Sequence, residues 1–270
     1  MGVVVVVERW WWCGGGGGSG WWVAGGWRVG GGWVAGGWRA VDGGPADMYL
    51  PSAVLEGKAG RIEWPDGREW TVDSGGTLRD CQLAPNLGLK ADWGVGVNGV
   101  LPEFEYEVTV TRGLGMEIRD IGDSYAVCGR VGTPGHRQFV VGLSGFHGEV
   151  ISPGPLVERT RVGVDVQQQL GAWTVLGELS VGDDNDDSRT QLLAELNWVN
   201  NDESVLVYLQ DVNRWRKTAG STESFNRLGL GIQYRPDSHW DVSAEMRQDL
   251  DVFPGAERVF TMLAQVRYRF

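Results

Sequence analysis

Apolar and polar positions alternate in segments of about ten residues along most of the chain. In the segment NRLGLGIQYR (226–235), Leu228, Leu230 and Ile232 occupy one set of alternate positions, and glycine, glutamine and arginine occupy the other. Successive side chains of a β-strand point to opposite faces of the sheet, so a period of two is typical of strands. The pattern therefore predicts an all-β fold.

The connections between these segments alternate between short turns and longer polar loops. The short turns are PDGR at 65, TPGHR at 133, LGA at 170, NNDE at 200 and PDSH at 236; the longer loops are VGDDNDDS at 181, NRWRKTAGSTES at 213 and DLDVFPGAER at 249. An antiparallel up-and-down meander has this rhythm. The segments fall at 56–64, 68–76, 86–97, 104–113, 124–132, 137–149, 158–169, 172–182, 188–199, 203–213, 224–235, 238–249 and 258–270. We predict an up-and-down antiparallel β-barrel of about 12–14 strands.

Aromatic residues gather beside the short turns, in the phase of the apolar positions. Trp64 and Trp70 flank the first turn, and Phe139 follows the second. Trp and Tyr concentrate where a bilayer meets water, because each ring is apolar and carries a polar group. The residues that we expect at the membrane interface are Trp173, Trp198, Tyr234, Trp240, Tyr268 and Phe270.

Two kinds of barrel share this alternation. A soluble, lipocalin-like barrel buries its apolar face, whereas a transmembrane barrel turns that face to lipid. Aromatics at the turn ends, polar faces rich in glycine, arginine and glutamate, and long loops confined to one end favour the transmembrane β-barrel. The net charge of −11 argues against a nucleic-acid partner. No apolar run is long enough for a membrane-spanning helix, which leaves strands as the spanning elements.

The final nine residues, MLAQVRYRF, resemble the C-terminal strand of Gram-negative outer-membrane β-barrels. Such strands end in Phe after aromatic or apolar residues at alternate positions, which here are Phe270, Tyr268, Val266, Ala264 and Met262. The resemblance implies insertion into outer-membrane lipid by the barrel assembly machinery. Strand length, acidic outer loops and charged inner faces resemble the porin group in particular. Membership would imply a homo-trimer that passes small polar solutes.

The polar faces of the segments would line the lumen of such a barrel. An arginine turned to lipid at the bilayer midplane costs about 2–4 kcal/mol, which fixes the charged positions on the inside. The residues predicted to line the pore are Lys90, Asp92, Glu105, Glu107, Arg161, Asp165, Glu178, Glu195, Arg227, Arg235, Glu245, Arg247 and Arg267. A wet lumen with charges of both signs favours passive diffusion of small hydrophilic solutes. A barrel with a plugged lumen, which serves binding or structure, is the alternative.

The first 46 residues differ from the rest of the chain. They repeat WVAGGWR at 22–28 and 33–39 and contain the run CGGGGGSG. Such low complexity gives no ten-residue alternation, so we expect 1–46 to be irregular, and either disordered or mis-translated. The barrel would occupy 47–270. A count of thirteen strands is odd, and bacterial barrels use even numbers, so we expect an incomplete barrel whose first and last strands meet poorly or not at all.

Other motifs lack the context that their chemistry needs. GVGVNG (94–99) matches a dinucleotide-binding fingerprint, but a strand follows where a helix is required. DDNDD (183–187) lacks the glycine and glutamate of a calcium loop. The three histidines are far apart, and none accompanies a nucleophile motif. We therefore expect no enzymatic activity, no cofactor and no metal.

Overall fold

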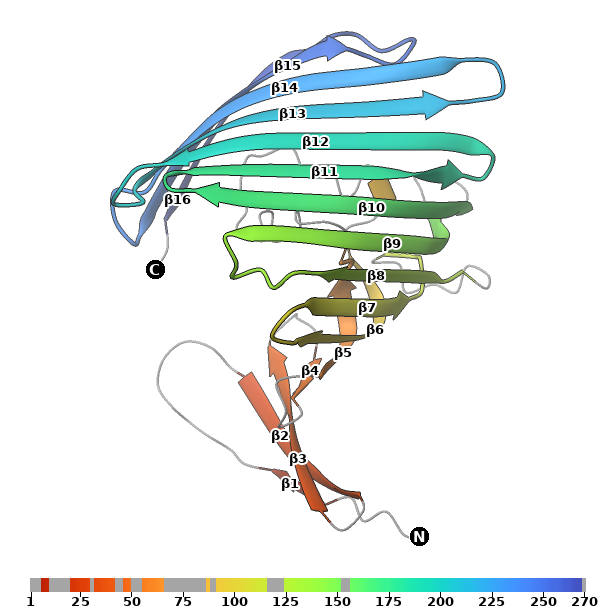
Figure 1. Ribbon diagram of the computed structural model, residues 1–270, viewed down its shortest axis with the longest axis vertical. Helices are drawn as coiled ribbons and strands as arrows, with labels where there is room; N and C mark the ends of the chain where they lie inside the picture. Colours follow the sequence, from red (N-terminus) through yellow and green to blue (C-terminus); the bar gives the residue numbers. More distant parts are fainter. Residues whose placement is uncertain are drawn as a thin grey trace.

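The fold is a single antiparallel β-sheet in which each strand pairs with the next one along the sequence (Figure 1). The computed structural model describes residues 6–9, 20–29, 32–41, 46–49, 55–65, 86–87, 91–115, 124–151 and 156–268. The predicted up-and-down antiparallel order is confirmed. Within these ranges, no helix is long and apolar enough to cross a bilayer.

Twelve strands, β5 to β16, form the part of the sheet that follows residue 55. Their bounds are β5 Glu56–Glu63, β6 Ala91–Val100, β7 Glu105–Thr111, β8 Ala126–Gly132, β9 Phe139–Ile151, β10 Leu156–Leu170, β11 Trp173–Asp184, β12 Asp187–Val199, β13 Val205–Lys217, β14 Thr222–Tyr234, β15 Trp240–Asp251 and β16 Phe260–Tyr268. This number lies within the predicted range.

Four further strands precede these twelve and contradict the expectation that 1–46 would be irregular. They are β1 Val6–Arg9, β2 Gly20–Val29, β3 Gly32–Val41 and β4 Ala46–Tyr49. β2 and β3 pair so that the two copies of WVAGGWR run antiparallel to each other, with Ala24 opposite Gly37. Backbone pairing does not require alternating side chains, and Trp and Val favour extended conformations. The proposed division of the chain at residue 47 stays a prediction.

The first connection of the twelve-stranded part corrects the strand count. β5 pairs directly with β6 in antiparallel register, with Lys58 opposite Gly96. The predicted strand at 68–76 lies outside the described residues. Since twelve alternating strands separate the start of β5 from the end of β16, both lie at the same end of the sheet. The predicted odd count of thirteen strands would place them at opposite ends and is therefore wrong, whereas the predicted short turn at 65 falls mostly outside the described residues.

Two of the predicted long loops are mostly strand. β11 and β12 are joined by residues 185–186 alone, and β13 and β14 by 218–221. Asn185 takes the left-handed φ of 51°, which a tight hairpin turn requires and which Asn tolerates. The polar residues that indicated loops extend the strands instead, because they pair with charged residues on neighbouring strands. Only the third segment contains a longer connection, at 252–259.

The two ends of the sheet differ in their connections. We call the turn end the one with connections 171–172, 200–204 and 235–239, and the loop end the one with 185–186, 218–221 and 252–259. The β14–β15 turn is held by Asp237, whose carboxylate accepts hydrogen bonds from the backbone nitrogens of His239 at 2.7 Å and Trp240 at 3.1 Å. The hydrogen bond from the His239 nitrogen lowers the pKa of Asp237 below its ordinary value.

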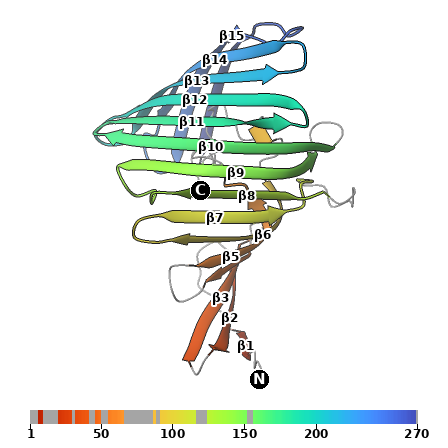
Figure 2. The ribbon, with the colours of Figure 1, turned by 45° about the vertical axis from the view of Figure 1, so that its right-hand side comes forward.

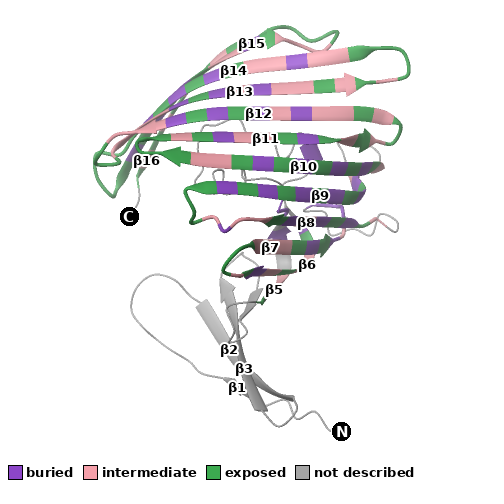
Figure 3. Ribbon diagram, in the orientation of Figure 1, coloured by how far each residue is buried: buried purple, intermediate pink, exposed green. Residues whose placement is uncertain are grey.

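The sheet curves strongly and stays open (Figures 1 and 2). Among the described strands, β16 pairs with β15 alone and β1 with β2 alone. Large apolar side chains such as Leu143, Val162 and Leu230 are exposed on one face, which we call the outer face. Asp165 and Glu245 are buried on the other, the inner face. Figure 3 shows the resulting alternation of buried and exposed positions along the strands. This burial pattern is the reverse of that in a soluble barrel.

Candidate functional site

The candidate site is the inner face of β6 to β16, which carries most of the buried charged groups of the described chain. The alternation of each strand places these groups there, because the intervening positions are apolar and exposed. Along β10, for example, Arg159, Arg161 and Asp165 are buried while Val162 and Val164 are exposed. A buried charge is costly unless it is paired, so the contacts of these groups determine what the face can do.

The most buried ion pair of the turn-end half joins β8 to β10 across β9. Arg130 donates from Nε to Asp165 Oδ2 at 2.9 Å and from Nη2 to Asp165 Oδ1 at 2.7 Å. Its Nη1 also donates to Glu105 Oε1 at 3.0 Å. The pair passes over Gly142 of β9, where an added Cβ would lie 2.4 Å from Arg130 Nη2 and 2.5 Å from Asp165 Oδ2. A side chain at this position would displace the ion pair, so glycine permits its close approach to β9.

Other acids of the turn-end half are also held by hydrogen bonds. Glu195 accepts from Asn197 Nδ2 at 2.8 Å and from Gln210 Nε2 at 3.2 Å. Asp241 Oδ2 accepts from Gln233 Nε2 at 2.6 Å and lies 3.5 Å from Arg267 Nη2. These contacts hold the acids in fixed positions on the inner face.

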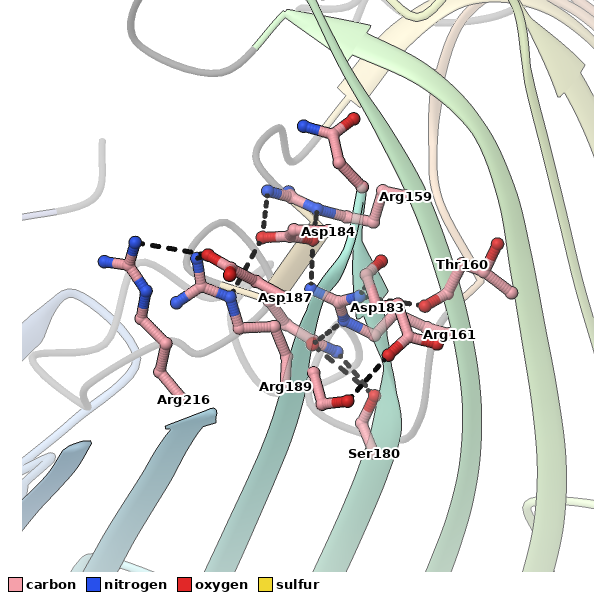
Figure 4. Close-up of polar contacts among 12 residues, drawn as sticks. Arg159, Thr160, Arg161, Ser180, Asp183, Asp184, Asp187, Arg189 and Arg216 are labelled. Atoms are coloured by element: carbon pink, nitrogen blue, oxygen red, sulfur yellow. Dashed lines mark hydrogen bonds and ion pairs between the residues drawn. The ribbon is translucent and has the colours of Figure 1, made fainter. Parts of the chain in front are cut away.

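The loop-end half contains a cluster of four guanidinium groups and two carboxylates (Figure 4). We call it the arginine cluster: Arg159, Arg161, Arg189, Arg216, Asp184 and Asp187. Its members come from β10, β11, β12 and β13, whose inward-facing positions meet near the hairpin at 185–186. The inner face is therefore rich in arginine at this end.

Asp184 is the centre of the arginine cluster. Its Oδ1 lies 2.6 Å from both Arg159 Nε and Arg161 Nη2, and its Oδ2 lies 3.3 Å from Arg189 Nε. Asp187 Oδ2 accepts a hydrogen bond from Arg216 Nη2 at 3.2 Å and lies 3.7 Å from Arg189 Nη2. Two carboxylates thus form ion pairs with four guanidinium groups.

Two connections reach the inner face from the loop end. In the first, between β5 and β6, the Trp64 ring packs 4.9 Å from that of Phe146, and Asn86 Oδ1 accepts from Arg161 Nε at 3.1 Å. Trp64 is fully buried, which contradicts its predicted place among the outward aromatics. In the second, Phe253 stacks on Phe225 with ring centroids 5.9 Å apart. Both connections cover part of the face.

An apolar patch lies beneath the second connection. It consists of four inward-facing side chains from adjacent strands, Leu176, Leu193, Val212 and Phe225. Val252 and Phe253 pack against it. Arg214 and Arg227 lie 4.9 and 5.1 Å from the centroid of the Phe225 ring, within the range of cation–π contacts. The inner face is thus not uniformly polar.

Most of the residues predicted to line a pore occur on the inner face. Those with contacts described above are Glu105, Arg161, Asp165, Glu195 and Arg267. The others on this face are Asp92, Glu107, Glu178, Arg227, Glu245 and Arg247. Arg235 lies just after β14 and is more exposed than the rest. Lys90 lies outside the described residues. Their role in lining a pore stays a prediction.

The aromatics expected at a membrane interface lie on the outer face at the turn end. Trp173 stands directly opposite Trp198 in the β11–β12 register. Trp240 stands opposite Tyr268, with ring centroids 4.8 Å apart. Tyr234 is exposed at the end of β14, and Phe270 lies outside the described residues. The level that they share is consistent with an interface, which stays a prediction.

Several residues of the inner face were not predicted from the sequence. Arg159 has the same phase as Arg161 in VERTRVGV, so extending that alternation by one step would have identified it. Asp184, Asp187 and Arg216 belong to stretches that were interpreted as loops. Arg130 follows Cys128 in a segment with little polarity. In the part of the chain that the structure describes, no three His, Cys, Asp or Glu side chains are placed to hold a metal ion.

Comparisons with known proteins bear on the fold. No protein-family model matches the chain, and no curated protein matches its sequence. Solved structures do match. OmpF of Salmonella typhi, in complex with daunomycin, is 10% identical with a TM-score of 0.65, over 98% of this chain and 95% of that one. Outer-membrane-expressed OmpT of Vibrio cholerae is 12% identical with a TM-score of 0.64, over 92% and 88%.

A third match is an anion-selective porin from Comamonas acidovorans. It is 12% identical, with a TM-score of 0.61, over 94% of this chain and 90% of that one. Identities this low show the fold alone. Together with the antiparallel strand order and the reversed burial pattern, they show that the chain has the fold of the outer-membrane porins.

Proposed function

We propose that the chain acts in the outer membrane of a Gram-negative bacterium as a passive channel for small hydrophilic solutes. One observation carries this proposal: charged groups such as Asp165, Arg161 and Glu245 are buried on the inner face, while apolar side chains are exposed on the outer face. Lipid can solvate the outer face, and only a wet lumen can solvate the unpaired parts of the inner one.

The charges of the inner face favour polar solutes over apolar ones. Acids and bases of both signs are fixed there by short contacts, such as those of Arg130 with Asp165 and Arg227 with Asp249. Fixed charges that line a narrow lumen interact favourably with polar, hydrated solutes. Apolar solutes make no such interactions there, so such a lumen disfavours them. The proposed substrates are therefore small and hydrophilic.

The proposed partners follow from the same location. The outer face would contact outer-membrane lipid, with Trp173 and Trp240 at the level of the head groups. OmpT of Vibrio cholerae also has a structure described as a trimer form, which supports a homo-trimer here. The barrel assembly machinery is proposed on the resemblance of the last nine residues. No nucleic-acid partner is proposed.

The alternative, a barrel whose lumen is plugged, is favoured by one specific observation. The connections that bear Trp64 and Phe253 fold onto the inner face and bury apolar side chains there. Inward segments narrow a lumen, and large ones close it. The channel proposal requires that these two leave a water-filled path.

No enzymatic activity belongs to the proposal. His147 lies on the outer face, where its ring contacts the hydroxyls of Tyr125 and Thr160 at 3.3 and 3.0 Å. His239 lies in the exposed turn beside Asp237. Both are remote from the inner face, where a solute would pass.

Conductance of the purified full-length chain in planar bilayers tests the proposal. We expect stepwise increases in current as single molecules insert, because a wet lumen carries ions. Liposomes that contain the protein should admit small sugars and exclude large ones. The heat-denatured protein is the matched control. Insertion into the bilayer without current or sugar entry would refute the channel and support the plugged barrel.

A further inference from the structure

The arginine cluster has more positive than negative charge. Four guanidinium groups face two carboxylates, which leaves two positive charges within a group of direct contacts. Glu223 Oε2 lies 4.0 Å from Arg216 Nη1, at the limit of an ion pair. Even when Glu223 is counted, one positive charge is not balanced. Excess charge in a partly buried site favours an anion from solution.

The strand register brings like charges together. Arg189 and Arg216 are direct cross-strand neighbours in the β12–β13 pair, and both side chains face inward. Like charges directly opposite each other destabilise a sheet unless an opposite charge lies between them. Asp187 contacts both arginines, and Asp184, which is shared with Arg159 and Arg161, also contacts Arg189. An added anion would stabilise the pair further.

The cluster also contains guanidinium nitrogens without acceptors. Arg159 is almost completely buried, yet its Nη1 makes no hydrogen bond. The Nε atom of Arg216 likewise makes none, and that of Arg189 lies 3.3 Å from Asp184 Oδ2 without a well-directed hydrogen bond. A buried donor without an acceptor is destabilising, so these guanidinium groups can accept a further hydrogen-bond acceptor.

The open side of the cluster is formed by its two less buried arginines. The side chain of Arg189 is 28% exposed and that of Arg216 is 40% exposed, whereas Arg159 and Arg161 are enclosed. A guanidinium group presents parallel N–H donors that match the oxygens of a carboxylate or phosphate. Two such groups side by side form a binding site for an anion with several oxygens.

We propose that the arginine cluster binds a small oxyanion of the phosphate class, held by Arg189 and Arg216 on its open side. The inference rests on the proposed function in one respect, since it names a solute class for the same inner face. In this site Asp184 and the buried Arg159 and Arg161 form the floor, where they contact one another (Figure 4), and the more exposed Arg189 and Arg216 would donate to the anion. Chloride, a single sphere without directed acceptors, binds less tightly.

Isothermal titration calorimetry of the full-length protein in detergent, with inorganic phosphate as the probe, tests the proposal. At equal ionic strength, phosphate should bind about tenfold or more tightly than chloride. Arg189→Ala and Arg216→Ala should each weaken phosphate binding by about tenfold. The matched control is Arg137→Ala, which removes an exposed arginine in the turn at 133–138 and should leave binding unchanged.

A second variant separates binding from folding. Asp187→Asn removes a negative charge from the cluster and should strengthen phosphate binding by about threefold or more. Damage to the fold cannot produce an increase. Equal heats for phosphate and chloride, or an affinity that Asp187→Asn lowers, would overturn the oxyanion site.

The outcome is independent of the conductance measurement. Phosphate binding with this pattern of variants in a protein that carries no current would uphold the oxyanion site and refute the channel. Current without phosphate binding would uphold the channel and refute the oxyanion site.

Discussion

Replacing Arg130 with leucine is expected to lower the free energy of unfolding by about 3–5 kcal/mol. The change leaves the Asp165 carboxylate, whose side chain is only 1% exposed, without its two hydrogen bonds from the guanidinium group. It also removes a donor from Glu105. Urea unfolding of the variant in lipid vesicles, followed by tryptophan fluorescence, measures the loss.

Two further variants make this result specific. Arg130→Leu combined with Asp165→Leu removes both charges and should recover most of the stability, since no buried carboxylate is left unpaired. Arg137→Leu breaks the pair with Glu103, which is 80% exposed, and should cost less than about 1 kcal/mol. Equal losses for Arg130→Leu and Arg137→Leu would show that Asp165 is solvated in the native protein.

Replacing Leu179 with arginine should lower the free energy of unfolding in lipid vesicles by about 2–4 kcal/mol. Leu179 lies on the outer face of β11, between Val164 and Leu192 in the register of the neighbouring strands. If that face contacts hydrocarbon, the guanidinium group loses its water. Urea unfolding in vesicles measures the cost.

The matched control is Thr174→Arg, on the inner face of the same strand. A lumenal arginine retains its water, so we expect a change below about 1 kcal/mol. In a soluble barrel the order would be reversed, because the exposed Leu179 position would accept arginine freely. A larger cost at Thr174 than at Leu179 would therefore exclude the membrane orientation.

Strands with strict alternation were predicted well from the sequence. The segments expected at 158–169 and 188–199 correspond to β10 and β12, because the central outward positions of each strand, such as Val162 and Val164 in β10, are apolar and most inward positions are polar. Near the hairpin at 185–186 the alternate positions are no longer apolar, because residues there form ion pairs with neighbouring strands. Alternation then gives no signal for the strand. The N-terminal strands were missed for a related reason, because repeated Gly and Trp hide any period of two.

The sequence predicted which residues face inward, but not which of these residues contact one another. Asp165 and Arg161 could be placed on one side of β10 by counting in twos. That Asp165 meets Arg130 depends on three strands and on the missing side chain of Gly142 between them. The convergence of Arg189 and Arg216 likewise depends on the β12–β13 register. Register between strands is set by the whole sheet, and a single sequence specifies it weakly.

The most direct measurement is a spin-label accessibility scan of β14 in lipid vesicles, with the native cysteines replaced. Labels at Leu228, Leu230 and Ile232 on the outer face should collide mainly with oxygen, which dissolves in lipid. Labels at Gly229 and Gln233 on the inner face should collide mainly with a water-soluble nickel chelate. If the reagent that collides more often with the label alternates from one residue of β14 to the next, the outer wall faces lipid and the lumen is wet. The opposite phase, or inner positions closed to the nickel chelate, would contradict a water-filled channel.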